Sequence, residues 1–198
     1  MAGWLCGAEA EATIEEGEDL RVQRSSATVV CVIGDLDVTA LTRANVSTLS
    51  PPTDLSPLER AARATDAAGG AHAPYFAHDA DPLALVADAW VRLFEASGPI
   101  GELEVAVAET LARVRAQTIE MPDYYLVADA ETLTPTRRHW YFGLLHDAVA
   151  LRVVPVPIDA HHIVDALEHL SATRWWPPVP QLLDGIERRA PETAPLAT

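Results

Sequence analysis

Residues 27–34, Ala-Thr-Val-Val-Cys-Val-Ile-Gly, form a continuous apolar run that is rich in β-branched side chains. The run does not alternate between apolar and polar residues, as a strand with one solvent-exposed face would. Uninterrupted runs of this kind are typical of strands that are buried on both faces, in sheets that helices cover on each side. We therefore expect an α/β domain in which this run forms a core strand.

Two later segments also have the composition of strands. Residues 124–128 are Tyr-Tyr-Leu-Val-Ala, and residues 151–156 end in Val-Val-Pro-Val, where Pro155 indicates the end of the strand or an edge position. A helix over about 134–147, which begins at a Thr-Pro pair, separates them, and a helix over about 160–171 follows. This order of strands and helices favours parallel strands joined by right-handed crossovers.

Helix signals dominate the stretch between the first two strands. One helix starts at Ser56-Pro57, where serine can cap and proline fits the first helical position, and it ends at Gly69-Gly70. Two amphipathic helices follow, one after Asp81-Pro82 and one over about 100–117. We therefore predict a small Rossmann-like three-layer domain with a mostly parallel sheet and a helical insertion, at about 57–118, after the first core strand.

The other segments are expected to connect or flank this domain. Residues 1–26 are acidic and are predicted to form an N-terminal arm or hairpin, and residues 27–190 make up the single α/β domain. Residues 44–56, rich in Ser, Thr and Pro, are predicted to be a loop. Residues 191–198 are expected to form a flexible tail.

The chain has a net charge of −15, and all 14 of its basic residues are arginine. Such a surface repels nucleic acids and anionic membranes, because both bind proteins mainly through Lys and Arg. We therefore expect neither as a partner, whereas a basic protein or a bound cation is compatible with the charge. Alanine and arginine codons can be GC-rich and lysine codons are AT-rich, so the composition indicates a high-GC bacterium or its phage.

We expect neither a membrane-spanning segment nor a signal peptide. The chain has no apolar run long enough to span a membrane, and it does not begin with the basic and apolar regions of a signal peptide. The cysteines, Cys6 and Cys31, do not form a metal or redox spacing, and Cys31 is expected to be a small buried hydrophobe. We expect a cytoplasmic protein.

The best candidate for chemistry is Asp35-Leu36-Asp37-Val38-Thr39, which directly follows the first buried run. Ligands of parallel α/β sheets bind beyond the carboxyl ends of the strands, where this segment is expected to lie. Asp35 and Asp37 could hold Mg²⁺ through their oxygens, or one could attack a phosphoryl group while the other shuttles a proton. The alternative is that both aspartates cap or solvate a loop at the strand end.

A strand followed by Asp-x-Asp-x-Thr resembles the first motif of the haloacid-dehalogenase-like phosphohydrolases. The resemblance implies that Asp35 is the nucleophile and Asp37 the general acid/base, and that Asp129, at the end of a later strand, helps to bind Mg²⁺. An inserted helical region would correspond to the cap of that family. The chain departs from the pattern at Val38, where many members have glycine, and it has no lysine to bind phosphate. No strand with a terminal Ser or Thr could be assigned to the second motif.

Adjacent tryptophans form the other candidate site. Trp175-Trp176-Pro177-Pro178 combines two large aromatic side chains, which cannot easily face one core together, with a turn stiffened by prolines. An exposed aromatic residue here would favour contact with a partner. The alternative is that both tryptophans fold over the end of the sheet.

Three hypotheses follow from these features. The favoured one is a non-catalytic interaction or accessory protein that binds a protein partner through Trp175 and Trp176, because no complete catalytic set is visible. The second is an Mg²⁺-dependent phosphohydrolase that uses Asp35, Asp37 and Asp129. The third is an α/β module that binds a small molecule in the crevice at the strand ends.

Overall fold

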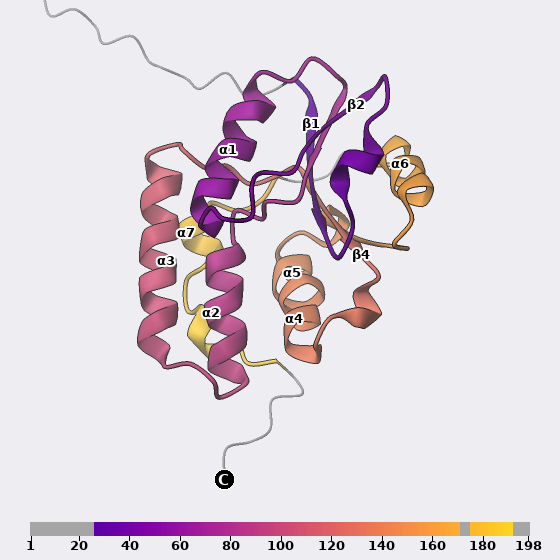
Figure 1. The fold of residues 1–198 in the computed structure, drawn as a ribbon. Coiled ribbons are helices and arrows are strands. Elements are labelled where there is room, and N and C mark those ends of the chain that lie inside the picture. The colour runs from indigo at the N-terminus through magenta and orange to yellow at the C-terminus, as the bar shows by residue number, and fades with distance from the viewer. Residues whose placement is uncertain (1–25, 171–174, 192–198) are drawn as a thin grey trace, which may run out of the picture.

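A five-stranded, all-parallel sheet runs through the centre of the molecule (Figure 1). The computed structural model describes residues 26–170 and 175–191. The strand order is β2-β3-β1-β4-β5, and the strands are β1 (Thr28–Ile33), β2 (Val46–Leu49), β3 (Tyr75–His78), β4 (Tyr124–Ala128) and β5 (Val153–Val156). With helices on both of its faces, this sheet confirms the predicted small Rossmann-like α/β domain.

The predicted core strand lies in the middle of the sheet. β1 pairs in parallel with β3 on one side and with β4 on the other, so that Val30 lies opposite Tyr124 and Cys31 opposite His78. Val30 and Cys31 point to opposite faces, and both are completely buried. Burial on both faces is what the uninterrupted apolar run predicts.

The helices are unequally divided between the two faces (Figure 1). Those on the first face pack against Cys31, Val127 and their neighbours, while those on the second face pack against Val30 and Leu126. The first face carries α1 (Pro57–Gly69), α2 (Ala84–Phe94), α3 (Ile100–Arg115), α4 (Pro135–His139) with its π-helical continuation η3 (Trp140–Leu145) and α5 (His146–Ala148), and the short α7 (Val179–Leu182). The second face carries the 3₁₀ helix η1 (Val38–Leu41) and α6 (Ala160–Glu168).

Two strands were missed by sequence reasoning. The predicted loop at 44–56 contains β2, and the region predicted as a helical insertion contains β3 in addition to its helices. Both strands have only four residues, and β2 is an edge strand that includes Ser47 and Thr48. Such short, partly polar segments become strands because partners are available for pairing, and composition does not reveal this.

The helix signals were more reliable guides. The Ser56 side chain accepts a hydrogen bond from the Glu59 N–H, and the Glu59 side chain accepts one from the Ser56 N–H, so the predicted capping box is present at the start of α1. The predicted helix that follows β5 is also present as α6, and the Asp159 side chain caps it by accepting hydrogen bonds from the His161 and His162 N–H groups. Near the C-terminal end of the described chain, the short α7 is followed by a 3₁₀ turn, Ile186–Arg188, with Gly185 in a left-handed conformation between them.

Other predictions concern the ends of the chain. The N-terminal arm, except its last residue, and nearly all of the C-terminal tail lie outside the described residues. Within residues 26–170 and 175–191, no helix combines the length and apolar character needed to cross a membrane.

Candidate ligand site at the carboxyl edge of the sheet

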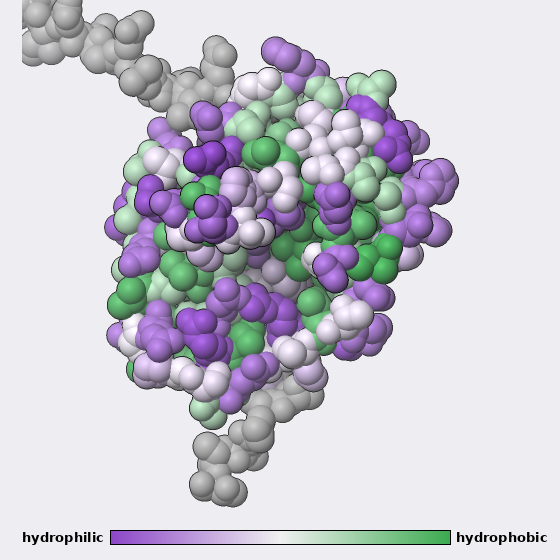
Figure 2. Space-filling view, viewed as in Figure 1, coloured by the Kyte–Doolittle hydropathy of each residue, from purple (hydrophilic) through white to green (hydrophobic). Residues whose placement is uncertain are grey.

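The chain leaves β1 in a different direction from the strands on either side of it. The segment after β1 enters η1 on the second face, whereas the segments after β3 and β4 lead to α2 and α4 on the first face. A crevice forms outside the carboxyl ends of the strands where connections diverge in this way, and ligands of open α/β sheets bind there. The surface is hollowed in the middle of the view, with apolar side chains at its floor (Figure 2).

Gly34 sets the close approach of β1 and β4 at this edge. Its φ is +133°, a conformation that L-residues with a side chain rarely adopt, and a Cβ added to it would lie 2.9 Å from the carbonyl oxygen of Ala128. The segment that starts at Asp35 therefore passes close to the end of β4, where Asp129 follows Ala128. The fold thus brings the predicted aspartates to adjacent strand ends on one edge.

Asp37 is the N-cap residue of η1. Its Oδ1 accepts hydrogen bonds from the Thr39 hydroxyl at 2.7 Å and from the Thr39 N–H at 2.9 Å. These bonds lower the pKa of Asp37, with the hydroxyl contributing most, and so favour its ionised form. The Asp-x-Thr part of the motif thus has a structural role as a helix cap, which was the alternative considered from the sequence.

The other two predicted aspartates lie on exposed or partly exposed loops. Asp35 is exposed, directly after Gly34. Asp129 has a left-handed backbone (φ 49°, ψ 54°), and its N–H donates to the carbonyl oxygen of Val156 at 2.9 Å. Aspartate and asparagine tolerate this conformation better than most residues do, so the position suits Asp129 without revealing a function.

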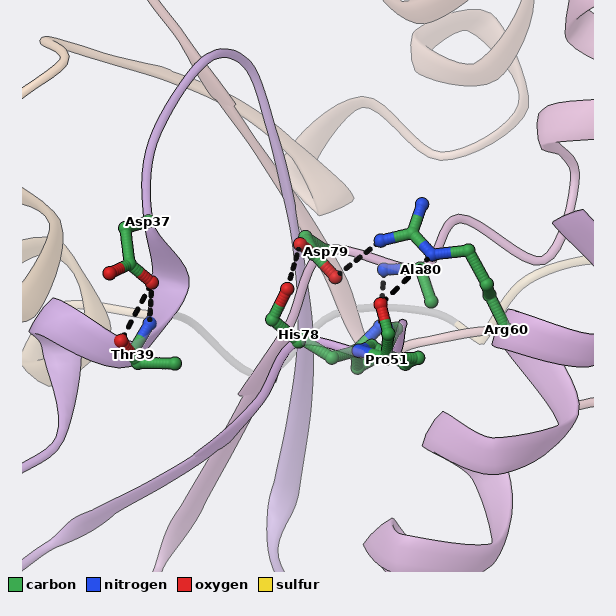
Figure 3. A network of polar contacts seen from close by, with 8 residues as sticks. Asp37, Thr39, Pro51, Arg60, His78, Asp79 and Ala80 are labelled. Carbon is green, nitrogen blue, oxygen red and sulfur yellow. Dashed lines mark hydrogen bonds and ion pairs between the residues drawn. The ribbon is translucent and has the colours of Figure 1, made fainter. Parts of the chain in front are cut away.

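An ion pair joins α1 to the segment after β3 at this edge of the sheet (Figure 3). Arg60 reaches from α1 and donates through Nη2 to Asp79 Oδ1 at 3.0 Å and through Nε to the carbonyl oxygen of Pro51 at 3.3 Å. The hydroxyl of Ser50, which follows β2, donates to Asp79 Oδ2 at 2.6 Å. This network joins three elements at the carboxyl edge, and the partial burial of Arg60 and Asp79 makes the pair less screened than an exposed one.

His78, the last residue of β3, is unsuited to acid–base catalysis near neutral pH. It is buried, and its Nδ1 accepts the Ala80 N–H at 3.3 Å. Burial lowers the pKa of His78 to about 4, so the imidazole is neutral at physiological pH. Its contribution here is to shape the turn that leads to Asp79 and Asp81.

Asp81 forms a buried polar centre behind this edge. Its Oδ1 accepts the Leu83 N–H at 2.8 Å and the Tyr125 hydroxyl at 2.9 Å, and its Oδ2 accepts the Tyr141 hydroxyl at 3.0 Å. Burial raises the pKa of Asp81, while these three donors oppose the shift. The carboxyl group thus ties β3 to β4 and to the π-helical segment η3.

Sequence reasoning missed Asp79 and Asp81 as part of the edge. Asp81-Pro82 was recognised only as the start of a helix. The missing signal was β3 itself, since any strand of a parallel sheet that ends at His78 places the following polar residues at the carboxyl edge.

The metal site remains a prediction. Among the residues that the structure describes, no group of three or more His, Cys, Asp and Glu side chains is arranged to hold a metal ion. The fold does bring Asp35, Asp37 and Asp129 to neighbouring strand ends. One oxygen of Asp37 already accepts two hydrogen bonds from Thr39.

The two predicted partner-binding tryptophans lie at the opposite, amino edge of the sheet. Trp175 is 59% exposed, and the guanidinium of Arg152 lies 4.7 Å from the centroid of its ring. Trp176 is partly buried, with its Nε1–H donating to the carbonyl oxygen of Pro122 at 2.8 Å and its ring meeting Tyr125 edge-on. The two residues therefore divide the roles considered from the sequence, since one is exposed and the other packs against the sheet.

Comparison of the chain with protein-family models, with curated proteins and with solved structures gave no match. The candidate sites therefore stand on their own geometry.

Proposed function

We propose that the protein is a ligand-binding α/β module whose crevice at the carboxyl edge takes a small cationic molecule. The observation that carries the proposal is that three acidic residues at this edge have no arginine partner among the described residues. Within the described part of the chain, no arginine forms an ion pair with Asp35, Asp37 or Asp129, whereas the nearby Asp79 is paired with Arg60.

Carboxylates at adjacent strand ends repel one another unless a cation lies between them. The attraction between one exposed carboxylate and a cation is weak because water and salt screen it. A ligand that carries more than one positive charge can contact several of these carboxylates at once and therefore suits the edge better than a single charge does. An amine with hydrogen-bonding groups suits a site whose rim also includes the Ser50 hydroxyl.

The second candidate function is the Mg²⁺-dependent phosphohydrolase. The position of the motif favours it, because Asp35 and Asp37 directly follow the central strand β1, and Asp129 follows its neighbour β4. In that function Asp35 would attack phosphorus and displace the leaving group, and Asp37 would donate a proton to the leaving oxygen. Mg²⁺ would shield the charge of the substrate phosphate.

Calorimetry on the wild type and on the variants Asp35→Asn, Asp37→Asn and Asp129→Asn tests the proposal. Each substitution preserves local structure, because asparagine caps a helix as well as aspartate does at position 37 and tolerates the left-handed backbone at position 129. Asp184→Asn, an exposed substitution after α7, is the matched control for the loss of one negative charge.

Spermidine, arginine and Mg²⁺ are the probes, at low ionic strength. We expect saturable binding of an amine that weakens about tenfold, or about 1.4 kcal/mol, in Asp35→Asn or Asp129→Asn and is unchanged in Asp184→Asn. Saturable binding of Mg²⁺ with the same dependence, followed by hydrolysis of a phosphate ester, would favour the phosphohydrolase instead. Equal weakening by Asp184→Asn would show that the amines bind only to the overall charge, and the proposal would be wrong.

A further inference from the structure

Trp175 is exposed but firmly positioned at the amino edge of the sheet. One face of its ring packs on the guanidinium of Arg152, which in turn lies 5.2 Å from the centroid of the Tyr124 ring. Arg152 also donates to the carbonyl oxygen of Asp123, and its side chain is only 4% exposed. The charge of this arginine is therefore held against Asp123 and the two rings and is not presented to solvent.

A pocket of about 420 Å³ opens beside Trp175. Its walls include Trp176, Pro177, Pro178 and Met121, and the exposed carboxylate of Glu120 lies at its border. Trp176 is held by its hydrogen bond to Pro122, and the prolines restrict the backbone. Little conformational entropy is lost when a partner binds to such a preorganised surface.

We propose that this Trp175 surface binds a basic segment of a protein partner that inserts an apolar side chain into the pocket. Charge complementarity identifies the partner, because the chain has a net charge of −15, which attracts basic proteins and repels acidic ones and nucleic acids. Glu120 supplies a negative charge at the pocket itself, where a lysine or arginine beside the inserted side chain would meet it. Exposed, rigid tryptophans are frequent anchors of protein interfaces.

The proposal is independent of the ligand site, which lies at the other edge of the sheet. It can be tested with two fluorescent peptides of twelve residues, one containing only leucine and lysine and the other only leucine and glutamate. Fluorescence anisotropy then measures their affinities for the full chain at two salt concentrations.

Two pairs of variants separate the Trp175 surface from general charge and hydrophobicity. Trp175→Ala is matched by Leu151→Ala, which removes another exposed apolar side chain of similar exposure (60% against 59%). Glu120→Gln is matched by Glu104→Gln, which removes one exposed carboxylate from α3. Because all four side chains are exposed, each variant should fold, and thermal unfolding checks this.

We expect the leucine–lysine peptide to bind the wild type and the leucine–glutamate peptide not to bind. Trp175→Ala should weaken binding at least tenfold and Leu151→Ala less than twofold, and Glu120→Gln should weaken it more than Glu104→Gln. Failure of the wild type to bind the leucine–lysine peptide, or equal effects of the two members of either pair, would overturn the proposal.

Discussion

The buried Asp81 carboxyl should depend more on Tyr141 than on Tyr125. Tyr141→Phe removes the hydrogen bond to Oδ2, whereas Tyr125→Phe leaves Oδ1 with the Leu83 N–H. Loss of a hydrogen bond that leaves a buried polar atom unsatisfied costs about 1–3 kcal/mol, so we expect Tyr141→Phe to lower the free energy of unfolding by about 2–3 kcal/mol and Tyr125→Phe by about 1–2 kcal/mol.

The pH dependence follows from the same contacts. Because burial raises the pKa of Asp81, its ionisation opposes folding, and its contribution to stability falls as the pH rises from the unfolded value of 3.8 through the folded pKa. Removing the Tyr141 hydroxyl takes a hydrogen bond from the ionised form of Asp81, so the loss of stability on ionisation becomes larger. The cost of Tyr141→Phe should therefore be larger at pH 7 than at pH 3.5.

Urea denaturation at the two pH values measures these effects. Tyr75→Phe, at a half-buried tyrosine of β3, is the control and should change the free energy of unfolding by less than about 0.5 kcal/mol. A cost of Tyr141→Phe no larger than that of Tyr75→Phe would refute the argument, as would a cost that is larger at pH 3.5.

Three further predictions concern the edges of the sheet. Gly34→Ala should lower the free energy of unfolding by about 1–3 kcal/mol, because the new Cβ would meet Ala128 and the backbone there would be strained. Gly101→Ala should instead stabilise α3, because nothing lies within 4 Å of the added Cβ. Urea denaturation of the two variants checks both expectations. NMR titration should find His78 neutral above pH 5. Because its pKa is lowered in the folded protein, the free energy of unfolding should fall as the pH drops from 6.5 towards 4. A titration midpoint of His78 near pH 6.5 would contradict its buried position. Trp176→Phe should cost about 0.5–1.5 kcal/mol in thermal unfolding through the lost bond to Pro122, and a neutral effect would argue against that contact.

The parts of the fold that could be predicted have strong local signals. β1 was recognisable because its apolar run is uninterrupted, and α1 because a serine, a proline and a glutamate occur at the spacing of a capping box. In each case the segment's own residues carry most of the information about its structure.

β2 and β3 could not be predicted because their stability comes from pairing. Each has four residues, and neither is β-branched throughout. Their hydrogen bonds go to strands far away in the sequence, as in the pairing of Tyr75 with Val46 and Thr28. A reading based on local composition does not include these partners.

The missing strand also explains what was missed at the candidate site. Asp35 and Asp37 were found because they follow a strand that was recognised. Asp79 and Asp81 follow β3, which was not recognised, so their place at the same edge could not be anticipated. Arg60 was identified only as part of a helix, and its reach to Asp79 depends on how α1 packs against the sheet.

The most direct test of the central claim is to map where a cationic ligand binds. Spermidine, or another amine found by calorimetry, is titrated into ¹⁵N-labelled protein and the backbone amide shifts are followed by NMR. We predict that the amides of Gly34, Asp37, Ala80 and Asp129 shift together and saturate, while the indole N–H of Trp176 at the amino edge does not change. Shifts spread over acidic residues of the whole surface, or confined to the amino edge, would contradict a ligand site at the carboxyl edge of the sheet.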